Sequence, residues 1–180
     1  ADCYSELALR KPDKLRIVGL VDPDPVRLNF MGRKYSVPEE RWFTSLEDFL
    51  AKDQFADAVL NGTLDHLHVV TSVPVLEKGY DLLLEKPFCV NEEELWTLQK
   101  VAQRTGRKVM ICHVLRYTPF YRAIKEHLLS GDIGQVLSIS LTEHVAYHHF
   151  AAAFIRGKWA NESPPGAPLL LAKSCHDLDL

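Results

Sequence analysis

Long hydrophobic runs are missing from this sequence: none reaches the roughly 18 apolar residues that a membrane-spanning helix needs. Paired cysteines are missing too, because the four cysteines stand at positions 3, 89, 112 and 175 with no CxxC spacing. That spacing excludes the common zinc-ribbon pattern and is typical of free thiols in a reducing compartment. We therefore predict a cytoplasmic protein with no metal site of that kind.

An excess of positive charge is also missing. The chain has 21 Lys and Arg against 24 Asp and Glu, a net charge of −3 over 180 residues. A mildly acidic chain gains little from a phosphate backbone, so a nucleic-acid partner is disfavoured. Hydrophobic residues make up 47% and charged residues 25%, which is typical of a globular chain with one domain, or one domain and part of another.

Strand and helix patterns alternate through the first two thirds of the chain. The apolar run LRIVGLV at 15–21 is typical of a buried parallel strand, and further strands are predicted near 42–43 and at 56–60, 80–84 and 108–112. Helices are predicted between them, with turn residues or caps at their ends. This alternation predicts an α/β fold: a parallel sheet covered by helices on both faces.

The pattern changes after His113. A helix over 120–129 leads to a turn and then to a longer strand over 135–147, where apolar residues alternate with small or polar ones. A loop rich in turn residues fills 161–168, and a helix runs from 169 to 180. We expect a domain boundary near 113–116, giving domains 1–115 and 116–180. The helical patterns at both ends look cut, so we expect an internal piece of a longer protein.

Asp22 follows the first predicted strand and precedes a helix. In a dinucleotide-binding fold an acid at this place accepts hydrogen bonds from the adenosine ribose, although an Asp at the start of a Pro turn is common as well. The glycine fingerprint G-x-G-x-x-G is absent, since the nine glycines never fall in that spacing. In such a fold the fingerprint would lie upstream of a helix like 1–10.

Two turns follow the next strands. Glu85-Lys86-Pro87 ends the strand at 80–84, where a lysine can donate to a substrate hydroxyl or a cofactor ribose and the Pro can hold a rigid turn, with a cis peptide as one option. A solvated lysine in a loop is the alternative. Asp65, His66 and His68 follow the strand at 56–60; a metal site there is disfavoured for want of further ligands, and helix capping by Asp65 is the plainer interpretation.

The last helix carries three polar residues at helical spacing, Lys173, His176 and Asp179. Histidine is the usual general base near neutral pH, and a carboxylate nearby can orient it; an exposed surface histidine is the alternative. The two histidines at 148 and 149, with Arg156 downstream, either face a polyol or anionic substrate or lie in a solvated loop.

Together these pieces resemble the Gfo/Idh/MocA oxidoreductases, the glucose–fructose oxidoreductase and inositol dehydrogenase family. The matching stretches are VGLVDPDP (18–25), GTLDHLHV (62–69), LEKGYDLLLEKP (76–87), HVLRYTPFY (113–121), SGDIGQVLSIS (130–140) and CHDLDL (175–180). The resemblance implies a Rossmann-type sheet, here lacking its first strand and glycine loop, followed by the start of an α/β substrate and oligomerisation domain. It also implies a homo-oligomer in the full-length protein.

The resemblance further implies oxidation or reduction of a sugar or cyclitol hydroxyl, with NAD preferred over NADP because Asp22 would repel a 2′-phosphate. His176 would take the hydroxyl proton and Lys86 would position the reacting oxygen. The implied cofactor contacts are Asp22, Thr63, Asp65, His68, Glu85, Lys86, Pro87 and Arg116, and the implied substrate contacts are Lys173, Arg156, Tyr117 and Asp179.

One position departs from the family pattern: Ala172 stands four residues before His176, where family dehydrogenases commonly carry an Asp. Lys173 beside it either lowers the pKa of the base or binds an acidic substrate. Two other functions stay open, a non-catalytic relative that senses a sugar or dinucleotide, and an NAD-dependent glycoside hydrolase. Retention of both Lys86 and His176 favours the dehydrogenase.

Overall fold

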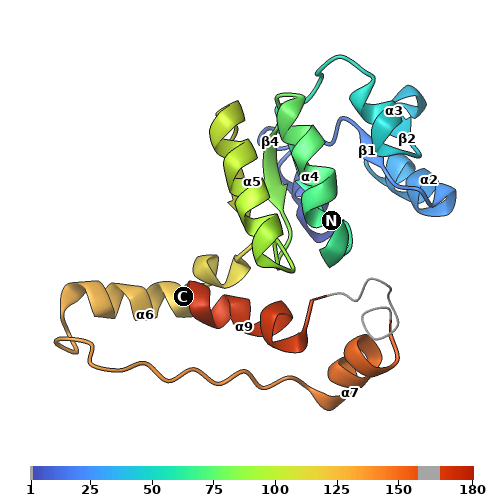
Figure 1. The fold of residues 1–180 in the computed structure, drawn as a ribbon. Coiled ribbons are helices and arrows are strands. Elements are labelled where there is room, and N and C mark those ends of the chain that lie inside the picture. The colour runs from blue at the N-terminus through green and yellow to red at the C-terminus, as the bar shows by residue number, and fades with distance from the viewer. Residues whose placement is uncertain (1, 158–166) are drawn as a thin grey trace.

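The computed structural model describes residues 2–157 and 167–180. Its first part alternates helices and strands (Figure 1): α1 (Asp2–Arg10), β1 (Leu20–Val21), α2 (Pro25–Lys34), β2 (Trp42–Phe43), α3 (Leu46–Leu50), β3 (Ala58–Asn61), α4 (His68–Glu77), β4 (Asp81–Leu84), α5 (Glu92–Thr105) and β5 (Val109–Ile111). Its second part holds α6 (Pro119–Ser130), α7 (Tyr147–Phe150), a π-helical turn (Ala151–Ile155) and α9 (Leu169–Asp179).

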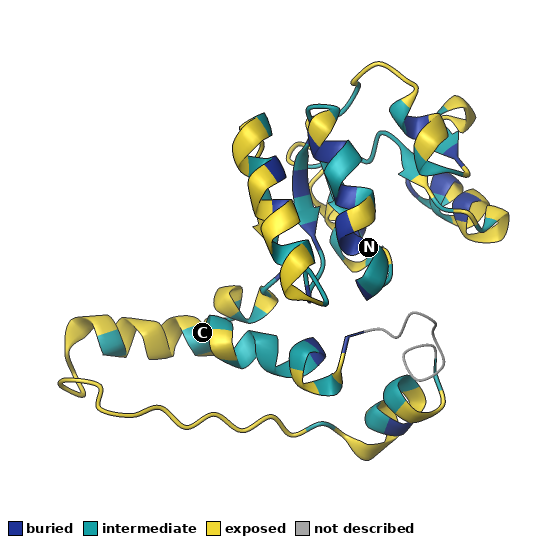
Figure 2. Cartoon of the chain, in the orientation of Figure 1, coloured by how far each residue is buried: buried dark blue, intermediate teal, exposed yellow. Residues whose placement is uncertain are grey.

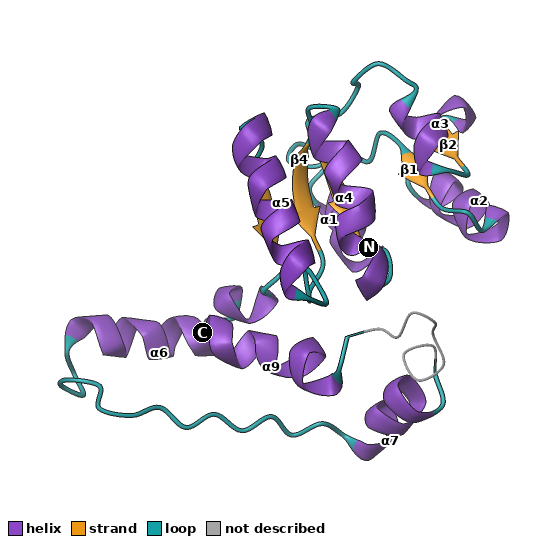
Figure 3. Ribbon diagram, in the orientation of Figure 1, coloured by secondary structure: helices purple, strands orange, loops and turns teal. Residues whose placement is uncertain are grey.

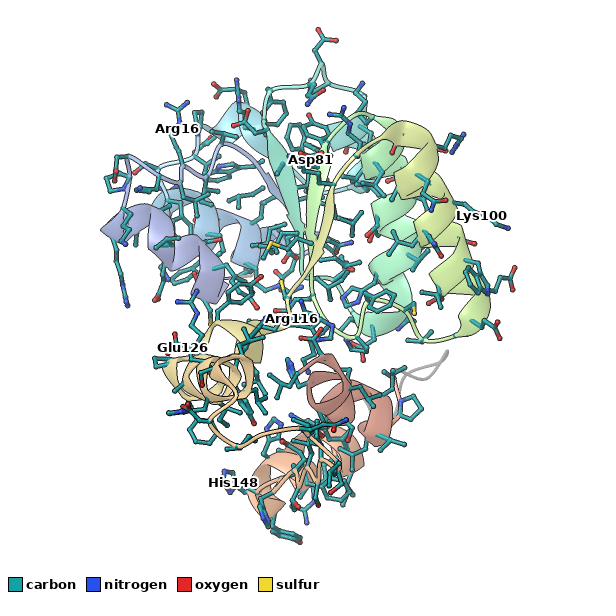
Figure 4. The ribbon with its side chains drawn as sticks, turned by 90° about the vertical axis from the view of Figure 1, so that its left-hand side faces the viewer. Arg16, Asp81, Lys100, Arg116, Glu126 and His148 are labelled. Atoms are coloured by element: carbon teal, nitrogen blue, oxygen red, sulfur yellow. The ribbon has the colours of Figure 1, made fainter. Side chains whose placement is uncertain are left out.

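All strand pairs are parallel. β4 lies between β3 and β5, with Leu83 opposite both Leu60 and Met110, and β1 pairs with β2 in a second small sheet. Helices α4 and α5 cover one face of the three-stranded sheet, and α1 lies on the other side (Figure 4). The predicted α/β class with helices on both faces is therefore confirmed.

The core lies between this sheet and its helices. Leu76, Tyr80 and Leu84 are fully buried there, and Phe49 and Phe55 pack edge to face beside them. Helix ends follow the sequence: Asn91 accepts the N–H of Glu94 at the start of α5, and Gly106 ends that helix with a φ of 66°. The core thus holds the carboxyl ends of β3, β4 and β5 in fixed positions.

The predicted strand over 135–147 is wrong. Residues 135–146 are extended but form no ladder, and α7 begins at Tyr147. A strand needs neighbours for its backbone groups, and the described part of the chain places none beside this segment. It runs from α6 to α7 as an exposed loop, yellow along most of its length (Figure 2).

The remaining sequence predictions concern one strand, one loop, the cysteines and membrane-spanning helices. The strand predicted over 15–21 pairs only at Leu20 and Val21. The loop predicted over 161–168 falls mostly outside the described residues. All four cysteines are free, as expected, and no described helix has the length and apolar character needed to cross a membrane. The domain boundary near 113–116 stays a prediction.

Candidate active site at the carboxyl ends of the strands

Lys86 follows β4 and turns toward α9. Its Nζ donates a hydrogen bond of 2.7 Å to the carbonyl oxygen of Ala172, and its backbone N–H donates to Oε2 of Glu85 at 3.0 Å. The peptide bond between Lys86 and Pro87 is cis, the option raised by the sequence. The other Glu85 oxygen accepts from the hydroxyl of Tyr4 in α1 at 2.8 Å. The turn is therefore held from both sides, with its ammonium against α9.

The buried ring of His68 contacts both the turn at Glu85–Pro87 and the turn that begins at Thr63. Its side chain is buried, at 1% exposure, and its two ring nitrogens lie 2.8 Å from the carbonyl oxygen of Pro87 and 3.1 Å from that of Thr63. The structure thus places His68 behind the loops, in a position to orient them. Thr63 in turn donates from its hydroxyl to Oδ1 of Asn61 at 2.8 Å.

His176 lies on α9 beside a second histidine. Its ring is edge to face with that of His113, with 5.7 Å between the centroids, and its Nδ1 is buried with no hydrogen-bond partner among the described residues. Burial, followed by the positive charge of Lys86, lowers the pKa of His176 below its usual 6.5. The ring is therefore held neutral, the form that accepts a proton.

Asp179 joins α9 to the segment after β5. Arg116 donates two hydrogen bonds of 2.5 Å to its carboxylate, which lowers the pKa of Asp179. Oδ1 of Asp179 also lies 3.3 Å from Nδ1 of His113, outside hydrogen-bonding geometry. Arg116 and Asp179, which the sequence assigned to the cofactor and the substrate respectively, thus bind each other. Figure 4 shows Arg116 between the sheet and the helices of the second part of the chain.

Lys173 is the second lysine near this edge. Its Nζ lies 3.0 Å from Nε2 of His149 and 6.0 Å from the centre of the Phe154 ring. Burial, followed by repulsion from Lys86, lowers the pKa of Lys173. Both lysines line one pocket of about 190 Å³, whose walls are Asp65, Lys86, Pro87, His149, Ala153, Phe154, Ala172 and Lys173.

The remaining predicted residues lie around this pocket or away from it. Asp65 is buried at the pocket wall and accepts the N–H of Ala167 at 3.2 Å. Asp22 follows β1, and its carboxylate accepts hydrogen bonds from Arg27 and from the N–H of Asp24. Tyr117 is half exposed, and Arg156 is exposed and does not line the pocket.

Two contributing groups escaped the sequence analysis. Asn61 ends β3 and donates to Thr71 and Ser72 at 2.8 and 2.9 Å, which ties β3 to α4; a polar residue closing an apolar strand was the available hint. His113 opens the matching stretch at 113–121, and the sequence predicts no role for its side chain. Its contact with His176 crosses 63 residues and follows from the fold alone.

Comparison with known proteins shows what this chain is similar to. The model of the GFO_IDH_MocA oxidoreductase family, described by its NAD-binding Rossmann fold, matches residues 4–113. A Bacillus subtilis protein named as an oxidoreductase, YteT, is 30% identical over 168 residues, which are 91% of this chain and 38% of that protein. The inositol 2-dehydrogenase of Corynebacterium glutamicum strain R is 27% identical over 124 residues, 68% of this chain and 36% of the enzyme.

A solved structure extends the likeness to the second part of the chain. The WlbA dehydrogenase of Chromobacterium violaceum, in complex with NADH and UDP-GlcNAcA, superposes with a TM-score of 0.82 over 99% of this chain and 50% of that one, at 18% identity. At this identity the likeness concerns the fold. The chain thus spans half or less of the length of these relatives.

Proposed function

The chain belongs to the Gfo/Idh/MocA oxidoreductase family with its NAD-binding Rossmann fold, and from this premise we propose that it is part of an NAD-dependent oxidoreductase acting on a sugar or cyclitol hydroxyl. One observation carries the proposal: Lys86, which follows β4 at the carboxyl edge of the sheet, donates to the carbonyl oxygen of Ala172, one helical turn before His176 on α9. After burial, the positive charge of this lysine lowers the pKa of His176. Ligands of open α/β sheets bind at this edge.

The residues at the edge fit a dinucleotide. Asp22 closes β1, and Arg27 and the Asp24 N–H hold its carboxylate in one orientation while a third of the side chain stays exposed. A carboxylate held in this way can accept hydrogen bonds from the adenosine ribose, and it favours NAD over NADP. The turns at Thr63–Asp65 and Glu85–Pro87 would border the nicotinamide half. Bound NAD supplies the hydride acceptor.

The side chains then divide the work on the alcohol. Lys86 exchanges its bond to the Ala172 carbonyl for one to the reacting hydroxyl oxygen and stabilises negative charge there. Nε2 of His176 takes the hydroxyl proton, because Nδ1 is buried, and bound NAD would accept the hydride from the carbon that carries this hydroxyl. Asp179 favours the imidazolium that results, since its negative charge raises the pKa of His176 against the effect of the lysine.

The test measures NAD reduction on a polyol and sugar panel with the full-length protein. We expect His176→Gln to lower kcat by about a hundredfold or more and Lys86→Met by a similar factor. The matched control is His127→Gln, on the exposed face of α6, which should leave kcat unchanged. NADH binding, followed by its fluorescence, should survive His176→Gln and His127→Gln.

Ala172 favours the alternative function, a non-catalytic relative that senses a sugar or dinucleotide, because family dehydrogenases commonly carry an acid at this position beside the base. NADH binding without turnover on any alcohol would favour that function. Release of free sugar from a glycoside without net NADH formation would favour the hydrolase. Full activity of His176→Gln would remove the proposed base.

A further inference from the structure

The pocket at the edge of the sheet gathers positive charge. Lys86 enters it from the turn after β4 and Lys173 from α9, and after burial the positive charge of Lys86 lowers the pKa of Lys173. Among the residues that the structure describes, neither lysine forms an ion pair with a carboxylate. Two like charges on one wall are costly unless a ligand of opposite charge joins them.

One carboxylate lies at the same pocket: Asp65, whose Oδ2 accepts the N–H of Ala167. Glu143 acts on Lys173 and on His176, and its effect on Lys173 ranks below burial and below the repulsion from Lys86. Among the described residues that line the pocket, two lysines thus face one carboxylate, which leaves a surplus of positive charge.

Lys173 is held in place for such a ligand. An ammonium has only hydrogens to donate, so Nε2 of His149 accepts from it. The ring of Phe154 and the methyl groups of Ala153 and Ala172 form apolar walls around the charge. A charge held against apolar walls interacts more strongly with an incoming anion than a solvated surface lysine does.

We propose that the substrate carries an anionic oxygen group, a carboxylate or a phosphate, which binds Lys173 while its reacting hydroxyl lies at Lys86. The inference rests on the proposed function and narrows its substrate class from polyols in general to sugar acids or sugar phosphates. The carboxylate accepts hydrogen bonds from Nζ of Lys173, and no covalent step is involved.

The test titrates matched ligands into the full-length protein by calorimetry: glucuronate and glucose, galacturonate and galactose, and glucose 6-phosphate. At least one anionic ligand should bind about tenfold or more tightly than its neutral counterpart, because a charge-assisted hydrogen bond contributes that much. Lys173→Met should abolish the difference, and Lys173→Arg should keep it. Lys100→Met is the charge-matched control, because Lys100 lies on the outer side of α5, far from α9 (Figure 4).

A parallel NADH titration separates this inference from the proposed function. If the protein prefers anionic ligands but does not bind NADH, the proposed anion site at Lys173 is supported and the proposed oxidoreductase function is rejected. NADH binding with no anionic ligand preferred over its neutral counterpart would overturn the pocket alone. If Lys173→Met binds NADH more weakly but binds the sugar ligands unchanged, the lysine contacts a cofactor phosphate. That result would also overturn the proposed anionic substrate group.

Discussion

Two half-buried histidines, His113 and His176, share one electrostatic environment. Burial is the largest cause that lowers the pKa of each, and the charge of Lys86 adds to it in both. Asp179 opposes the shift in both rings, but Arg116 already binds its carboxylate. The pair is therefore neutral at the pH where free imidazoles begin to charge, and a proton taken by either ring is stabilised mainly by Asp179.

This environment makes stability depend on pH. The pKa of histidine in the unfolded chain is about 6.5, and the pKa values of His113 and His176 in the folded protein lie below it. The stability that these neutral rings contribute is therefore full above about pH 6.5 and is lost as pH falls through the folded pKa values. We expect the free energy of unfolding in urea to fall between about pH 7 and 5. His113→Gln should flatten this dependence, whereas exposed His127→Gln should keep the slope. An unchanged slope in His113→Gln would contradict the assignment.

Local patterning predicted most elements because caps, turns and apolar runs act over a few residues. Ser45 caps α3 and Pro25 opens α2 as the sequence indicates, and the strands at β3, β4 and β5 lie within the predicted ranges or shifted by one residue. The strand at 135–147 failed because an alternating pattern describes a face and cannot supply a neighbouring strand. The pairing of Arg116 with Asp179 escaped for a similar reason: it depends on where α9 docks (Figure 3).

Helix α2 packs closely against β2 at a glycine. A Cβ at Gly32, in the last turn of α2, would overlap the indole ring of Trp42, whose Nε1 donates to the carbonyl oxygen of Val37 at 2.8 Å. The glycine is needed there for close approach, since a helix would otherwise favour alanine by about 1 kcal/mol.

We expect Gly32→Ala to lower the free energy of unfolding by about 1–3 kcal/mol, the usual cost of overpacking. Asn29→Ala on the exposed side of the same helix should change it by less than about 0.5 kcal/mol. In a Trp42→Phe background the cost of Gly32→Ala should shrink. A cost that stays the same in both backgrounds would mean that the indole is not the obstacle.

The molecule as a whole divides into a packed sheet with its helices and a looser second part. The core residues lie almost entirely before residue 113, whereas Leu137 and Ile139 of the connecting segment are 89% and 72% exposed. Local stability follows buried contacts and protected hydrogen bonds. We therefore expect the 180-residue chain to open first between α6 and α7.

Limited proteolysis checks this expectation. The first cuts by a protease of broad specificity should fall within 132–146, and the fragment that begins at the N-terminus should resist further digestion. Mass spectrometry of the early fragments locates the cuts. First cleavage between β3 and β5 would show that the sheet opens before the connecting segment.

The contacts that dock α9 onto the sheet have a consequence for how such a scaffold diversifies. Lys86 binds the carbonyl oxygen of Ala172, and Asp65 binds the N–H of Ala167. Every amino acid has that carbonyl, and every one except proline has that N–H, so these two hydrogen bonds do not depend on the identity of the side chains at 167 and 172. Selection can therefore exchange an acid for an alanine at position 172 and retune the chemistry while both hydrogen bonds are kept.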